Sequence, residues 1–171
     1  MNASKKKAYF TKVYDAESDS VFRFCFFKTS DRNVALELTQ DIFLRFWKNI
    51  SDGKKIKNHR AFLFKVARNR IIDWYRSKKA LSLDTMIEDK GDLVFADGLW
   101  ESQLDIEDMA EGRYVIEKIK SLHPTLRQAV YLRFVEGFSP GDIAKILDIS
   151  SNAASVRINR GLAELRFNLK I

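Results

Sequence analysis

Residues 138–160, FSPGDIAKILDISSNAASVRINR, contain two helix start signals separated by a short turn. Ser139 is suited to cap a helix, Pro140 to fill its first position, and Asp142 follows three residues after the cap. A second start signal begins directly after Asp148, so the first helix must end there. The segment therefore predicts a helix, a tight turn and a second helix.

The second of these helices, expected over about residues 151–169, separates its apolar and polar residues. Its core positions recur every three or four residues: Ala154, Ile158, Leu162, Leu165 and Leu169. The outer face carries small or polar side chains and arginines: Ser151, Asn152, Ser155, Val156, Arg157, Asn159 and Arg160. Short polar side chains can reach base edges in the major groove while arginines hold phosphates. An ordinary hairpin with a polar face is the alternative, but the capping, the small Ala144 and the tight turn favour DNA binding.

Upstream, residues 121–137, SLHPTLRQAVYLRFVEG, predict one more helix in this block. It is expected to begin after Pro124 and to end at Gly137. Three apolar residues at intervals of four are expected to face the core: Leu126, Val130 and Phe134.

Residues 1–79 predict helices over about 5–29, 31–50 and 59–79, and Ser18 and Ser20 allow a split in the first. The second has a broad apolar face: Val34, Leu38, Ile42, Phe43, Phe46 and Trp47. Its opposite face carries Glu37, Gln40, Asp41 and Arg45. Spacing alone favours a solvated face with an internal ion pair over a docking surface for a basic partner.

The third helix follows the basic loop SDGKKIKN at residues 51–58. Its expected core seam is Leu63, Ala67, Ile71 and Trp74, and the remainder is basic or polar: Arg60, Lys65, Arg68, Asn69, Arg76, Lys78 and Lys79. Cations interleaved with aromatic rings suit single-stranded nucleic acid. A purely structural role is favoured for Phe62 and Phe64, whereas Trp74 and Tyr75 fit either role.

Charge divides the 171 residues into three parts: +11 over residues 1–79, −9 over 80–111 and +5 over 112–171. The two basic parts are expected to be helical domains, and the acidic part reads as a linker because its helical periodicity is weak. Basic blocks of this size suit a polyanion partner, although two solvated domain surfaces would also account for the charge. The fold class is therefore all-α, with two domains joined by an acidic linker.

Composition excludes several other functions. Apolar residues make up 46% of the chain, with 7 Gly and 2 Pro, which is typical of a globular protein of long regular elements. Neither a membrane span nor a secretion signal is recognisable, so a cytoplasmic location without membrane insertion is expected. Cys25 lies in an apolar run and is expected to be an inert buried thiol, and with only His59 and His123 no metal cluster can form. We therefore expect no enzyme activity, no cofactor and no metal.

Read in order, the two basic blocks resemble a known family. VALELTQDIFLRFW (34–47) followed by NHRAFLFKVARNRIIDWYRS (58–77) is similar to region 2 of the sigma-70 family, and LHPTLRQAVYLRFVEGFSPGDIAKILDISSNAASVRINRGLAELR (122–166) to its region 4. With these two regions and a short linker, the chain resembles an extracytoplasmic-function sigma factor. Such a protein binds core RNA polymerase, directs it to a subset of promoters and helps to melt them.

The resemblance also implies roles for individual residues. Contacts with the core polymerase fall on Glu37, Leu38, Gln40, Asp41 and Phe43, which reverses the local reading of that helix face. Contacts with the single-stranded minus-ten element fall on Lys54, Lys55, Lys57, Asn58, Arg60, Lys65, Arg68, Asn69, Trp74 and Arg76. Contacts with the minus-thirty-five element fall on Ser151, Asn152, Ser155, Arg157 and Arg160. Family members are often restrained by a membrane-bound anti-sigma factor, so one is expected as a partner besides core polymerase and promoter DNA.

The chain departs from the family pattern at three positions of region 4. Asp148 replaces the usual turn glycine, Ser155 replaces a lysine and Leu162 an arginine, which changes the expected phosphate contacts but not the helical seam. A rival function is a stand-alone helix-turn-helix regulator whose N-terminal block senses a ligand and dimerises. That function leaves the basic aromatic helix at 59–79 without a role.

Overall fold

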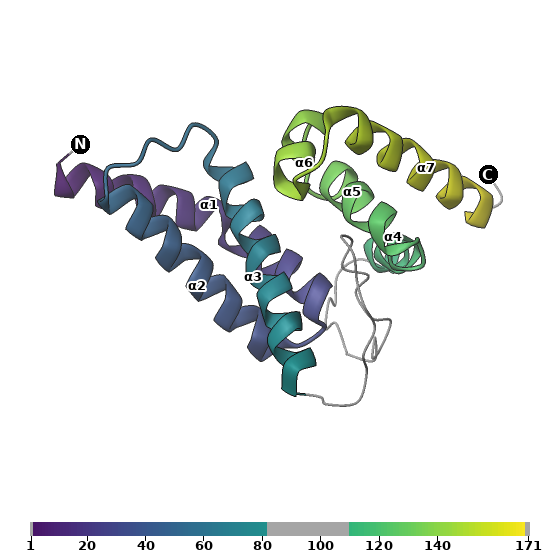
Figure 1. Cartoon of the computed structure of the whole chain (residues 1–171), viewed down its shortest axis with the longest axis horizontal. Helices are drawn as coiled ribbons and strands as arrows, with labels where there is room; N and C mark the ends of the chain where they lie inside the picture. The colour runs from purple at the N-terminus through teal and green to yellow at the C-terminus, as the bar shows by residue number, and fades with distance from the viewer. Residues whose placement is uncertain (1, 82–109, 170–171) are drawn as a thin grey trace. The chain divides into compact units, whose positions relative to one another are not determined.

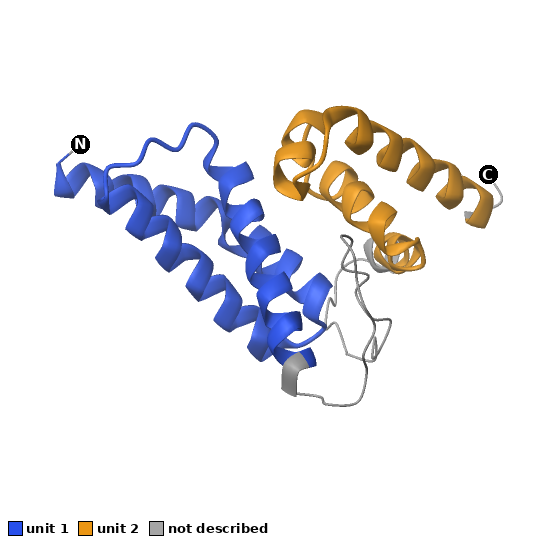
Figure 2. Cartoon of the chain, in the orientation of Figure 1, with its two compact units in different colours: residues 1–88 blue, residues 89–171 orange. Residues whose placement is uncertain are grey.

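The computed structural model describes residues 2–81 and 110–169, and within these ranges every regular element is an α-helix (Figure 1). The described helices are α1 (Ala3–Thr29), α2 (Arg32–Ser51), α3 (His59–Leu81), α4 (Ala110–Lys120), α5 (Pro124–Phe134), α6 (Pro140–Leu147) and α7 (Ser151–Leu169). The chain divides into two compact units, residues 1–88 and 89–171 (Figure 2). The all-α class is confirmed, whereas most of the predicted linker falls outside the described residues.

In the first unit, a two-residue turn folds α1 and α2 into an antiparallel hairpin. Ser30 takes a left-handed conformation, with φ of 53°, and its N–H donates to the Phe26 carbonyl at 2.9 Å. The Asp31 carboxylate then caps α2 by accepting the N–H groups of Asn33 and Val34. The end of α1 and the start of α2 are thereby both capped within two residues.

Helix α3 runs alongside the hairpin and closes a three-helix core (Figure 1). Near its start, Arg60 pairs with Glu17 of α1, and near its end the Tyr75 hydroxyl donates to the Lys28 carbonyl. These contacts show that α3 is parallel to α1. The fully buried side chains between the helices are Phe24, Ile42, Phe46, Leu63, Phe64 and Ile71.

Helix α1 is continuous, so the split allowed around residues 18–20 does not occur. Val13, Glu17 and Val21 lie on one buried stripe at intervals of four, which crosses the serine-rich stretch without a break. Glu17 is tolerated there because Arg60 donates to its carboxylate at 3.0 Å. Burial and this ion pair outweigh the modest helix preference of serine.

In the second unit, α5 and α7 form the central pair, with α4 and α6 packed against them (Figure 1). The fully buried side chains are mainly aliphatic: Ile119, Leu122, Tyr131, Leu132, Ile143 and Ile146. Helix α4 was not among the predicted elements, although Ile116 and Ile119 lie three residues apart on it and Leu122 follows just after its end. Its short apolar stripe follows directly on the acidic segment, which obscured it.

The expectation that Phe134 faces the core is wrong, because its side chain is 52% exposed at the last residue of α5. The chain instead turns at Gly137, which has φ of 73°, and the Phe138 N–H donates to the Leu132 carbonyl. Phe138 is buried in place of Phe134. Val130 is buried as predicted, whereas Leu126 is only partly buried.

Within residues 2–81 and 110–169, no helix combines the length and the apolar character that a bilayer span requires.

Candidate nucleic-acid and protein interfaces

The residues predicted to bind a protein partner all lie on α2, but not all of them are on its outer face. Glu37 and Gln40 are exposed, and neither has a polar partner among the described residues. Leu38 and Phe43 from the same set are buried, with exposed fractions of 6% and 3%. These two residues therefore support the face from the core side of α2 and present little surface of their own.

Three apolar side chains that the predictions did not assign to this surface are exposed on α2, and one of them is Leu36, which is 41% exposed. Leu44 is 66% exposed, and Trp47, which was expected in the apolar seam, is 36% exposed. The Trp47 ring packs edge-on against Phe10 of α1, with centroids 5.4 Å apart. Exposed leucine and tryptophan beside polar groups are typical of a protein interface.

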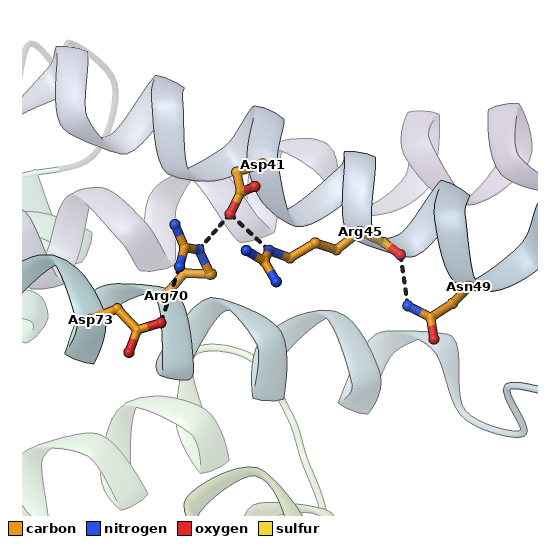
Figure 3. Close-up of polar contacts among 5 residues, drawn as sticks. All are labelled: Asp41, Arg45, Asn49, Arg70 and Asp73. Atoms are coloured by element: carbon orange, nitrogen blue, oxygen red, sulfur yellow. Dashed lines mark hydrogen bonds and ion pairs between the residues drawn. The ribbon is translucent and has the colours of Figure 1, made fainter.

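Asp41 differs from Glu37 and Gln40 because its carboxylate already has two cationic partners (Figure 3). Arg45 donates to it at 3.0 Å, as the spacing predicted, and Arg70 of α3 donates to the same oxygen. Burial raises the pKa of Asp41, but the hydrogen bonds and positive charges of the two arginines outweigh that effect. The pKa of Asp41 consequently lies below its ordinary value.

The basic loop before α3 presents lysines to solvent. Lys54, Lys55 and Lys57 are all exposed. Asn58 has a structural task, because its side-chain oxygen accepts the Ala61 N–H at 2.9 Å and so caps α3. The three lysines are therefore the part of this loop that can track phosphates.

The polar side chains predicted to contact single-stranded DNA along α3 differ in availability. Arg60 is engaged by Glu17 and lies over the Phe64 ring, so its charge is partly used within the unit. Lys65 and Arg68 are partly buried, whereas Asn69 and Arg76 are exposed. The accessible polar surface of α3 therefore centres on its middle and last turns.

The two aromatic residues near the end of α3 have separate roles. Trp74 is half-buried, and the Lys78 ammonium lies 5.0 Å from its ring centroid. The Tyr75 hydroxyl donates to the Lys28 carbonyl and ties α3 to α1. Trp74 with its adjacent cation is thus the better stacking platform of the two.

The helix-turn-helix of the second unit forms as its start signals predicted. The Ser139 hydroxyl accepts the Asp142 N–H at 3.1 Å and donates to the Asp142 carboxylate at 2.8 Å. Asp148 ends α6 in the left-handed region, with φ of 53°, at the position where the family has glycine. The Ser150 hydroxyl then accepts the Ala153 N–H and caps α7. The turn between α6 and α7 is therefore short, and the helix on each side of it is capped.

The first turns of α7 carry the residues predicted to read duplex DNA. Ser151, Asn152 and Arg160 are exposed, and Ser155 and Arg157 are partly buried. Ala154 and Ile158 are buried on the opposite side, and Leu162 and Leu165 are partly buried. The predicted separation of a polar outer face from an apolar inner face is present.

Gly161 allows the close approach of α7 to α5, a feature that the sequence reading missed. A Cβ placed on Gly161 would lie 2.3 Å from the Val130 Cγ2 atom, well inside van der Waals contact. The available signal was a glycine within a helix that is otherwise well formed, which commonly marks a packing requirement.

The single thiol, Cys25, is inaccessible to solvent. Cys25 is fully buried, and burial raises the pKa of its thiol to about 12, partly offset by a hydrogen bond with Thr39. Among residues 2–81 and 110–169, no group of three or more His, Cys, Asp or Glu is placed to hold a metal ion.

Two family models and several known proteins are similar to this chain. Residues 13–81 match the family model of sigma-70 region 2, and residues 112–165 match that of sigma-70 region 4. The chain is 24% identical over 172 residues to the ECF RNA polymerase sigma factor SigX of Bacillus subtilis, covering 95% of this chain and 84% of SigX. It is 25% identical over 167 residues to SigW of the same bacterium, covering 94% and 89%.

Two solved structures are similar in fold. The sigma factor RpoE in complex with the anti-sigma factor NepR, from Bartonella quintana, aligns with a TM-score of 0.67 and 23% identity over 95% of this chain and 97% of RpoE. CnrH in complex with the cytosolic domain of CnrY aligns with a TM-score of 0.66 and 20% identity over 96% and 89%.

Proposed function

We propose, from the premise that this chain belongs to the sigma-70 family and is an ECF-type RNA polymerase sigma factor, that its two units divide promoter recognition between them. Residues 1–79 bind core polymerase and the single-stranded minus-ten element, and residues 112–171 bind the duplex minus-thirty-five element. Residues 80–111 link the two. The rival stand-alone regulator is not favoured, because both family regions are present.

The observation that supports this proposal is that one chain presents two different surfaces suited in chemistry to nucleic acid. Helix α7 offers an exposed polar first turn suited to a major groove. Helix α3 offers Trp74 beside Lys78, with the exposed lysines of the preceding loop. Stacking of unpaired bases on such a ring offsets the few kcal/mol, roughly, that unstacking a base costs.

We assign direct contacts with polymerase and DNA to those residues whose side chains are accessible to solvent. For core polymerase we assign Glu37 and Gln40, with Leu44 and Trp47 as the apolar part of the same surface. For the minus-ten strand we assign Lys54, Lys55, Lys57, Asn69, Trp74 and Arg76. For the minus-thirty-five duplex we assign Ser151, Asn152 and Arg160, with Ser155 and Arg157 partly covered.

An anti-sigma factor is the proposed regulator of this chain. RpoE was solved with the anti-sigma factor NepR bound, and CnrH with the cytosolic domain of CnrY, which supports this expectation. The exposed Leu44 and Trp47 would serve such a partner as well as the polymerase, so that the two compete for one surface. The protein would act in the cytoplasm, where its polymerase is.

Run-off transcription with core RNA polymerase, in the presence and absence of this chain, tests the proposal. Templates selected from a random-sequence promoter library by the assembled holoenzyme supply the DNA. We expect specific transcripts only when the chain is present. A chain that binds DNA tightly without polymerase and yields no transcript with it would support the stand-alone regulator instead.

A further inference from the structure

Four charged side chains join α2 to α3 in one network (Figure 3). Arg45 and Arg70 both donate to Asp41, and Arg70 also donates to Asp73 at 3.0 Å. Two carboxylates and two guanidinium groups sum to zero charge. A basic partner approaching Asp41 therefore meets a neutralised cluster, in contrast with the Glu37 carboxylate, which has no polar partner among the described residues.

We propose that Asp41 is a positioning residue that acts through Arg70 on α3, whereas Glu37 and Gln40 supply the direct polar contacts to the polymerase. Asp41 is the only member of the predicted docking set for which the structure gives an ion pair to the nucleic-acid-binding helix. This inference rests on the proposed function and divides one predicted docking set into two roles.

The geometry of α3 explains what the contact controls. Successive residues of an α-helix point about 100° apart, so Arg70, which reaches toward α2, directs Asn69 and Arg68 to other sides. The Arg68 guanidinium and the Asn69 side chain lie 3.4 Å apart on that part of the helix. Holding Arg70 toward α2 therefore adds to the core packing of α3 and helps to keep these two groups in place.

The network is better suited to orientation than to global stability. Its four side chains are between 30% and 54% exposed, and ion pairs at that exposure contribute little to the free energy of unfolding. Removing Asp41, however, leaves Arg45 and Arg70 facing one another without the carboxylate between them. Arg70 would then no longer be held toward α2, while the aromatic core keeps the unit folded.

The test measures two quantities for each full-length variant. One is the affinity of the fluorescently labelled chain for core RNA polymerase, from anisotropy. The other is promoter opening at saturating chain, from permanganate reactivity of thymines in a promoter selected by the wild-type holoenzyme. Circular dichroism melting shows that each variant is folded.

We expect Glu37→Lys to weaken core affinity by about tenfold or more and to leave opening normal once the polymerase is saturated. Asp41→Asn should change core affinity by less than about threefold and reduce opening about tenfold. Arg70→Gln should reproduce the Asp41→Asn defect. The double variant Asp41→Leu with Arg70→Leu should regain opening, because an apolar pair can replace an ion pair across two helices.

Two results would overturn the inference. One is an Asp41→Asn chain that loses core affinity as strongly as Glu37→Lys while opening normally at saturation. The other is normal opening by the Arg70→Gln chain, which would stand even if the leucine pair failed to fold. A wild-type chain that fails to bind polymerase or open any promoter would instead refute the proposed function, and this inference with it.

Discussion

The two helical units bury their cores by different means. Between α1, α2 and α3, large rings such as Phe24, Phe46 and Phe64 fill the space, and charged pairs cross from helix to helix. In the second unit aliphatic side chains dominate, and a glycine brings α5 and α7 into close contact. The first unit should therefore be sensitive to cavities, and the second to added volume.

The largest effect is expected from a cavity in the first unit. Phe64 is fully buried, with its ring centroid 5.2 Å from that of Phe24. Phe64→Ala should lower the free energy of unfolding of this unit by about 3–5 kcal/mol. Hydrogen exchange with mass spectrometry, which follows each unit separately, should show faster exchange in α1–α3 and unchanged exchange in α5–α7.

Phe167→Ala is the matched control for that cavity, because the Phe167 side chain is 85% exposed. It should leave the exchange of both units unchanged. Equal acceleration of both units by Phe64→Ala would show that they unfold together, and the comparison between independent cores would fail.

The next largest effect is expected from added volume in the second unit. Gly161→Ala places a methyl group against Val130 and should destabilise α5–α7 by about 1–3 kcal/mol. Gly141→Ala is the control, because its new Cβ would meet only the Ser139 hydroxyl oxygen at 3.8 Å. If Gly161→Ala were as stable as Gly141→Ala by hydrogen exchange, close packing would not be what holds this unit together.

A smaller effect is expected at the cap of α6. Ser139→Ala removes the hydrogen bond to the Asp142 N–H and should cost about 1 kcal/mol of stability in the second unit. Ser139→Asp retains an acceptor at the cap and should recover most of the loss. If Ser139→Ala and Ser139→Asp were equally stable, the hydrogen bond at the cap would not set the start of this helix.

The smallest effect is the pH dependence of the interhelix network. Because the pKa of Asp41 is lowered in the folded chain, its carboxylate contributes stability that is present above its unfolded value of 3.8. That contribution is lost as the pH falls below 3.8 through the folded pKa. Denaturant titrations should therefore show less acid destabilisation in Asp41→Asn than in wild type, and identical pH profiles would contradict the assigned ion pairs.

Local signals explain why the helix-turn-helix could be predicted from the sequence. Ser139, Pro140 and Asp142 act within one helical turn, so the start of α6 depends on no distant residue. The end of α6 at Asp148 was equally local, because a new cap follows at once. The polar outer face of α7 then followed from helical periodicity.

Contacts between distant residues explain what could not be predicted. Arg70 lies 29 residues from Asp41, and nothing in the sequence around either residue indicates that the two pair. The same applies to Glu17 and Arg60. The resemblance assigned Arg60 to DNA binding, but its positive charge is paired with the Glu17 carboxylate. The exposure of Phe134 depended on the turn at Gly137, where Phe138 took its place in the core.

The affinity of the full-length chain for core RNA polymerase tests the central claim most directly. Wild type should bind, Glu37→Lys should bind about tenfold or more weakly, and Asp19→Lys, an exposed acid on α1 with the same charge change, should bind like wild type. A wild-type chain that does not bind core polymerase, or equal losses for both variants, would contradict docking through the outer face of α2.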